Sequence, residues 1–191
     1  MEVRCVLAGH PPPAGLVLRT GNTKGFLERC TTLSGQAVDL TAAVRMLEDR
    51  HAIADLIHAY CDHFDRNEPE AVAALFTADA EVDYGPEVAT IVGADAIASA
   101  IAVGLQTTFS ATSHHVSNIR LTFHGPDRAR AVSYLYAWHR YCDGSPDGEL
   151  WGRYRHRFER TGAGWRIAGL VLEAAGTAGF HRARMHAIGR G

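Results

Sequence analysis

The stretch Leu150–Leu172, LWGRYRHRFERTGAGWRIAGLVL, predicts two neighbouring strands joined by a tight turn. Apolar residues such as Tyr154 and Phe158 alternate with charged ones in its first part, which is the period of a half-buried strand. Thr161–Gly164 has the composition of a turn, and Trp165–Leu172 then forms a second, mostly apolar run. This part of the chain therefore favours a sheet of antiparallel strands with short connections.

Two further strands are predicted upstream, over His115–Phe123 and Ala129–Tyr141. Gly125–Asp127 separates them, and Asp143–Gly148 separates the second from Leu150; both segments are rich in turn-forming residues. A shorter strand is predicted over Ala80–Gly85.

Helical periodicity precedes these strands. Asp39 is placed to cap a first helix, and apolar residues from Ile53 to Phe64 then recur on one helical face. Pro69 suits the start of a short helix, and Gly93–Gly104 predicts another. Helices followed by antiparallel strands indicate an α+β fold, in which a strongly curved sheet closing over the helices would leave a conical pocket.

The chain divides into three predicted parts. Residues 1–36 lack clear periodicity and contain Pro11–Pro13, so we assign them to an irregular extension. Residues 37–180 form the α+β barrel domain, and residues 181–191 a C-terminal tail.

Composition narrows the classes of partner. The 191 residues are 47% hydrophobic and 21% charged with a formal net charge of -2, and no basic stripe indicates nucleic-acid binding. No apolar run is long enough to span a bilayer, and no signal pattern opens the chain. The four cysteines show no metal spacing, so we expect free thiols and a cytoplasmic protein.

Asp65 is the first candidate for chemistry. It continues the row Ile57, Cys61, Asp65 on the apolar helix face and lies near the helix C-terminus, where the macrodipole disfavours an anion. An inward carboxylate at that place needs a histidine or arginine partner. The alternative is a half-exposed residue of the turn Asp65–Asn67.

His115 is the second candidate. It shares the strand phase of Ile119, Leu121 and Phe123, which predicts that it faces the core and that His114 faces outward. Ser117 would lie beside it on the same face. A satisfied structural histidine is the alternative.

Other candidates follow from strand phase. Tyr84 shares the inward phase of its strand, where a buried hydroxyl can donate to a substrate oxygen or pack as an ordinary core residue. Tyr154 and His156 are candidates for the pocket wall. His139 is undecided, because alternation turns it away from the bulky residues of its own strand.

The 11 histidines are scattered, and no HExxH, HxH or Cys–His cluster occurs, so no metal is predicted. Phosphate-loop, dinucleotide and nucleophile-elbow motifs are also absent.

From Leu47 to about Gly179, the sequence resembles the SnoaL-like group of the nuclear-transport-factor-like superfamily. Leu47–Arg50 with the following apolar residues resembles the first long helix of that group, and His63–Asn67 resembles the end of that helix. Gly164–Leu170 resembles its last strand. The resemblance implies a cone-shaped α+β barrel with a deep pocket.

Within the group, the sequence resembles the scytalone dehydratases most closely in function. That resemblance implies catalytic positions at Asp65, Tyr84, His115 and His139, and it turns His139 toward the pocket. Asp65 with His115 also resembles the dyad of hexachlorocyclohexane dehydrochlorinase. Phe64 departs from the pattern, because the dehydratases carry a tyrosine there. Gly152 and Tyr154 depart as well, replacing a polar serine and asparagine.

These observations predict a cofactor-independent lyase or isomerase acting on a small cyclic or aromatic hydroxy-carbonyl compound. His115 would be the general base, Asp65 its orienting partner and Tyr84 the carbonyl donor, and His139 would assist the leaving group or share the proton. Tyr60, Phe64, Tyr154, His156 and Ser117 would contact the substrate.

Three alternatives remain: a cyclase or isomerase using Asp65 directly as base, a ligand-binding module, and a scaffold resembling the β subunit of ring-hydroxylating dioxygenases. The family resemblance also implies a homodimer or homotrimer formed through the outer sheet face, with Trp151 as a candidate contact.

Overall fold

The computed structural model describes residues 30–31 and 37–189, and the chain divides into two units, Met1–Arg50 and His51–Gly191. In the first unit, β1 (Cys30–Thr31) pairs antiparallel with β2 (Ala37–Val38). The remainder of the predicted extension over residues 1–36 lies outside the described residues. No helix within the described ranges is long and apolar enough to cross a bilayer.

The two helical segments expected from Asp39 onward are one helix, α1 (Leu40–Asp65). The backbone N–H of Ala42 donates to Asp39 Oδ1 over 3.1 Å, which caps its first turn. The buried face in the second unit consists of Ile53, Ile57, Tyr60 and Cys61. Asp65 ends the helix one turn beyond Cys61, on the same face.

Short elements connect this helix to the sheet. Pro69 opens α2 (Pro69–Ala73), and β3 (Phe76–Asp83) follows. β4 (Ile91–Val92) then pairs antiparallel with β3 and leads into α3 (Ala94–Thr107).

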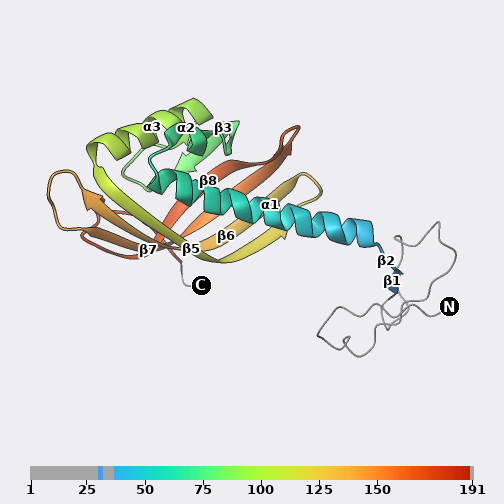
Figure 1. Cartoon of the computed structure of the whole chain (residues 1–191). Helices are drawn as coiled ribbons and strands as arrows, with labels where there is room; N and C mark the ends of the chain where they lie inside the picture. The colour runs from blue at the N-terminus through green and yellow to red at the C-terminus, as the bar shows by residue number, and fades with distance from the viewer. Residues whose placement is uncertain (1–29, 32–36, 190–191) are drawn as a thin grey trace, which may run out of the picture. The chain divides into compact units, whose positions relative to one another are not determined.

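The sheet order is β4-β3-β8-β7-β6-β5, with β9 beside β8. Its neighbours are antiparallel except for β3 with β8 and β8 with β9, which are parallel. The long strands appear in Figure 1 and are β5 (Phe109–Phe123), β6 (Arg128–Tyr141), β7 (Gly148–Thr161) and β8 (Gly164–Ala178).

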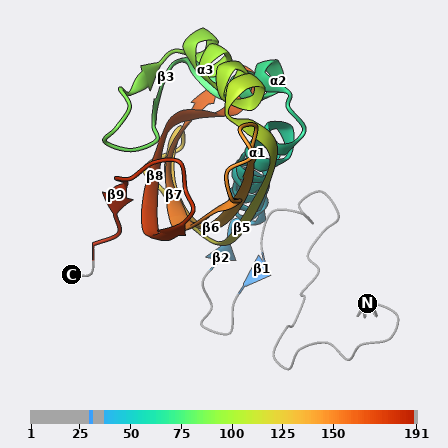
Figure 2. The same ribbon diagram turned by 90° about the vertical axis from the view of Figure 1, so that its left-hand side faces the viewer.

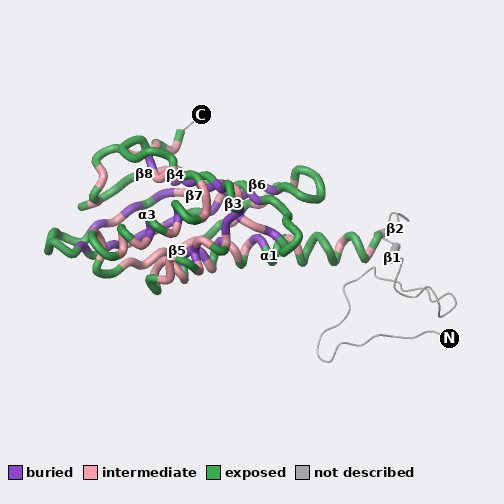
Figure 3. Tube along the Cα trace, turned by 90° about the horizontal axis from the view of Figure 1, so that it is seen from above, coloured by how far each residue is buried: buried purple, intermediate pink, exposed green. Residues whose placement is uncertain are grey.

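Strands β8, β7, β6 and β5 curve around an interior that α1 and α3 close on the remaining side (Figure 2). Buried residues alternate with more exposed ones along β6 and β7 and recur along α1 and α3 (Figure 3). Fully buried Ile53 and Ile57 of α1 meet Ile167 and Leu170 of β8 in one core cluster. The predicted fold class, a cone-shaped α+β barrel with a curved, mostly antiparallel sheet, is confirmed.

Strand β5 contains an irregularity that reverses the predicted phase of its first half. Ser117 pairs with Tyr134 but Arg120 pairs with Val132, so β5 holds one extra residue. Asn118 has a positive φ of 51° at this bulge. The prediction assumed that every second residue before Ile119 faces inward. The extra residue shifts this alternation by one, so residues predicted to face inward face outward. The prediction that His115 faces the core is therefore wrong, and His114 is the inward histidine.

The segment predicted to be a C-terminal tail contributes to the sheet. β9 (His186–Ala187) pairs with Glu173 and Ala174 of β8, and His186 Nε2 lies 2.9 Å from both carboxylate oxygens of Asp83. The boundary at residue 180 is corrected accordingly. The missed signal is weak, because a two-residue strand has no periodicity.

Candidate active site

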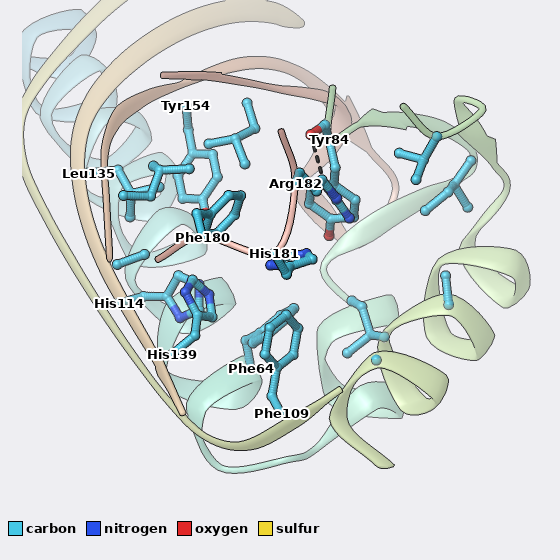
Figure 4. A pocket seen from close by; sticks show the side chains of 18 of the residues that line it. Phe64, Tyr84, Phe109, His114, Leu135, His139, Tyr154, Phe180, His181 and Arg182 are labelled. Carbon is cyan, nitrogen blue, oxygen red and sulfur yellow. Dashed lines mark hydrogen bonds between the residues drawn. The ribbon is translucent and has the colours of Figure 1, made fainter. Parts of the chain in front are cut away.

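A cavity of about 520 Å³ opens inside the curved sheet. Such a volume suits a small organic ligand. Its wall is mostly apolar, and its polar side chains come from α1, α3, β5, β6, β7, the residue after β3 and the segment after β8 (Figure 4). The residues used below are Tyr60, Phe64, Tyr84, Phe109, His114, His139, Tyr154, Phe180, His181 and Arg182.

The end of α1 and the first half of β5 form an Asp–His dyad. Asp65 Oδ1 lies 2.6 Å from His114 Nδ1, and Asp65 Oδ2 accepts the backbone N–H of His114 at 2.7 Å. The Thr112 hydroxyl donates to Oδ1 over 2.8 Å. Three donors thus fix the carboxylate, which engages Nδ1 and leaves His114 Nε2 available for other partners.

The Asp65 carboxylate lies behind the histidine. His114 lines the cavity and its side chain is 5% exposed, whereas Asp65 borders a separate shallow hollow with His58 and Asp62. Burial opposes ionisation of Asp65, but the hydrogen bonds and charge of His114 and the hydrogen bond of Thr112 lower its pKa below the ordinary value. Asp65 is therefore an ionised orienting group.

The predicted partner His115 lies on the outer face of β5. Its Nε2 lies 3.1 Å from the Ser113 hydroxyl, and its ring approaches Tyr136 with centroids 5.9 Å apart. Ser117 is also exposed. The bulge at Asn118 explains both corrections, because each residue was placed by the phase of Ile119.

His139 lies inside the cavity wall and is 5% exposed. Its ring meets the edge of His114 at a centroid distance of 5.4 Å. Burial, together with His114 and His181, lowers the pKa of His139 to about 3. It is therefore neutral near pH 7, so His114 beside Asp65 is the better placed imidazole to accept a proton.

A tyrosine pair occupies another part of the wall. The hydroxyls of Tyr60 and Tyr84 lie 2.8 Å apart. Burial raises the pKa of Tyr84 to about 12 and that of Tyr60 well above its ordinary value, so both remain protonated donors. Tyr154 packs edge-on against Tyr60, with ring centroids 5.7 Å apart, and also lines the cavity.

Two substrate-contact predictions have different outcomes. Phe64 lines the cavity and touches the His114 ring edge-on at 4.9 Å between centroids. His156 is 2% exposed and packs between Tyr154 and Phe158, outside this cavity. Its predicted place in the substrate pocket is therefore corrected. The position of a residue on the inward face of a strand does not show whether it lines the pocket or lies in the packed core.

Sequence reasoning missed Thr112, which donates to Asp65, and several residues of the cavity wall. Thr112 and Phe109 precede the predicted start of their strand at His115, and Phe180, His181 and Arg182 lie at or beyond the predicted domain end. Burial and the adjacent Arg182 lower the pKa of His181 to about 4.

No group of three or more metal-ligating side chains occurs in the parts of the chain that the structure describes.

A curved sheet and two helices around an apolar cavity, with the histidine of an Asp–His dyad in its wall, define a small-molecule-processing protein of the α+β barrel class. Residues 45–171 match the model of the SnoaL-like domain. The chain belongs to the SnoaL-like family. No protein with a curated functional description is significantly similar to it in sequence.

Solved structures agree with this family. A Novosphingobium aromaticivorans protein described as a "Putative Scytalone Dehydratase" is 35% identical, with a TM-score of 0.71 over 76% of this chain and 96% of that one. A second protein of that organism, described as a "putative aromatic ring hydroxylase", is 27% identical, with a TM-score of 0.65 over 69% and 93%. A hexachlorocyclohexane dehydrochlorinase shares the fold at 22% identity, with a TM-score of 0.67 over 74% and 97%.

Proposed function

We propose that this protein is a cofactor-independent lyase or isomerase that removes a proton next to a carbonyl group of a small cyclic substrate. The observation that carries the proposal is the 2.6 Å contact between Asp65 and His114 in the cavity wall. The similarity to a protein described as a scytalone dehydratase supports an elimination reaction.

His114 Nε2 is the general base, since Nδ1 is engaged by Asp65. The ionised Asp65 carboxylate stabilises the imidazolium that forms and holds its tautomer. His139 stays neutral, and in an elimination its ring N–H donates a hydrogen bond to the departing hydroxyl group.

The tyrosine pair stabilises the negative charge that develops on the substrate oxygen when the C–H bond breaks. Tyr84, hydrogen-bonded to Tyr60, polarises the substrate carbonyl and stabilises the enolate. In a dehydration, the C–H electron pair forms the enolate, which then expels the hydroxyl group from the β carbon, and the proton that His114 took from the substrate passes to that hydroxyl to make water. An isomerase returns the proton from His114 to another carbon instead.

The test uses a panel of small cyclic β-hydroxy ketones, whose dehydration creates a conjugated enone that absorbs in the ultraviolet. Asp65→Asn and His114→Gln should each lower kcat/KM by about 10²–10⁴-fold, the usual contribution of acid–base catalysis. His115→Gln is the matched control and should leave turnover nearly unchanged.

The reverse pattern, with His115→Gln inactive and His114→Gln active, would overturn this assignment. Ketones that bind but are not turned over by the wild-type protein would favour a ligand-binding role instead.

We further propose that the protein assembles as a homodimer or homotrimer through the outer face of the sheet. Tyr134 and Trp151 are 42% and 44% exposed there, and Trp151 packs against Tyr136 on the neighbouring strand. Exposed aromatic side chains that gather on one face are typical of protein interfaces.

A further inference from the structure

We infer that Arg182 is an anion-recognition residue, so that the preferred ligands of the cavity carry a carboxylate or an equally acidic oxygen. This inference deepens the proposed function and rests on it for the role of the cavity. It concerns binding rather than proton transfer, and can therefore be tested apart from the dyad.

Arg182 is the one cationic residue lining this cavity among the described residues. Figure 4 shows it beside Tyr84, across the cavity from His114 and His139. Its Nη1 donates to the backbone oxygen of Tyr84 over 2.7 Å, and its guanidinium lies 5.6 Å from the centre of the Tyr84 ring. These contacts hold the head group at the cavity wall.

The charge of Arg182 has no ion-pair partner within the described part of the chain. The charge of Glu87 favours the charged form of Arg182, but no ion pair joins the two side chains among the described residues. Glu87 accepts the backbone N–H groups of Ala183 and Arg184, at 3.2 and 3.1 Å, while Asp83 pairs with His186. The residue is also half-buried. An unpaired, partly desolvated guanidinium at a cavity wall gains most from a ligand that brings the missing negative charge.

The polar groups near Arg182 also favour an anion. Tyr60 and Tyr84 are protonated hydroxyls, and the neutral His181 lies between Arg182 and His139 in the view of Figure 4. The cavity lining contains neither aspartate nor glutamate within the described residues. A suitable ligand therefore carries an acidic oxygen that binds Arg182 and, at its other end, a C–H bond that lies next to His114.

The experiment compares a matched pair of probes, naphthoate and the neutral naphthamide, by isothermal titration calorimetry at about pH 8, where ordinary carboxylic acids are ionised and free imidazoles neutral. The wild-type protein should bind naphthoate at least about tenfold more tightly than naphthamide, the scale of one charge-assisted hydrogen bond. Arg182→Gln should abolish this preference, while Arg182→Lys should retain part of it.

Arg184→Gln is the matched control, since Arg184 is 75% exposed and does not line the cavity. Thermal melting of each variant checks that it is folded. Asp65→Asn should keep the preference for naphthoate even if it loses turnover, which separates this inference from the proposed base. Equal affinities for the two probes, failure of both to bind at millimolar concentration, or a preference that survives in Arg182→Gln would overturn it.

Discussion

Thr112 is a small residue with a large expected influence, since its hydroxyl is one of only three donors on the Asp65 carboxylate among the described residues. Thr112→Val keeps the shape but removes the hydrogen bond that favours the ionised acid. The pKa of Asp65 should then rise, and the acidic limb of the pH–kcat profile, on which the Asp65–His114 pair takes up a proton, should move to higher pH.

Thr112→Ser retains a hydroxyl and is the control that should restore the wild-type profile. An unchanged acidic limb in Thr112→Val would mean that the two hydrogen bonds from His114 are sufficient to hold the carboxylate.

His156 should make the free energy of unfolding depend on pH. It is 2% exposed, both ring nitrogens lack a described partner, and burial lowers its pKa to about 3 from 6.5. Between pH 6.5 and about 3, the unfolded chain therefore binds a proton at this histidine and the folded chain does not. Its contribution to stability is complete above pH 6.5 and falls by about 1.4 kcal/mol per pH unit between pH 6.5 and about 3.

His156→Phe removes this proton uptake and keeps an aromatic ring between Tyr154 and Phe158. Urea unfolding at several pH values should show a weaker acid loss for His156→Phe than for the wild type, whereas a change at exposed His124 (His124→Gln) should have little effect. His139 adds a similar acid dependence to both proteins. Parallel stability curves for His156→Phe and the wild type would refute the proposed role of His156.

At the element scale, the alternation of residues predicted the four long strands and the apolar face of α1, but it missed the first six residues of β5 and the last six of β8. It failed at Asn118, because counting by twos assumes an uninterrupted strand and a bulge leaves little mark in residue type. The dyad was therefore predicted with the correct aspartate and the wrong one of two adjacent histidines. The positive φ of Asn118 is the one local clue, since asparagine tolerates that region better than most residues.

Asn118 supplies a prediction for the strand. Asn118→Val places a β-branched side chain at a φ of 51° and should destabilise the fold by roughly 1–2 kcal/mol. Asn118→Gly, which accepts positive φ without strain, should be much less destabilising. Chemical denaturation measures both. Equal midpoints for Asn118→Val and Asn118→Gly would show that the bulge does not depend on this backbone conformation.

At the scale of the whole molecule, the site joins distant parts of the chain. Asp65 meets His114 across 49 residues of sequence, and Arg182 meets Tyr84 across 98. The contact of Asp65 with His114 could be anticipated from the family resemblance, because both residues lie in a helix or strand that the sequence pattern predicts or adjoins. The second could not, since Arg182 lies in an irregular segment whose position is fixed by long-range contacts such as His186 with Asp83.

The outer sheet face gives the last prediction. Trp151 lies opposite Tyr136 in the β6–β7 ladder and is 44% exposed, so a partner would bury a large aromatic surface there. Sedimentation velocity should show a dimer or trimer for the wild-type protein and a monomer for Trp151→Lys. Val92→Lys, at a residue 60% exposed on β4, is the control and should remain oligomeric. A monomeric wild type would mean that these aromatic side chains serve another contact, and a Trp151→Lys oligomer would place the interface on a different face.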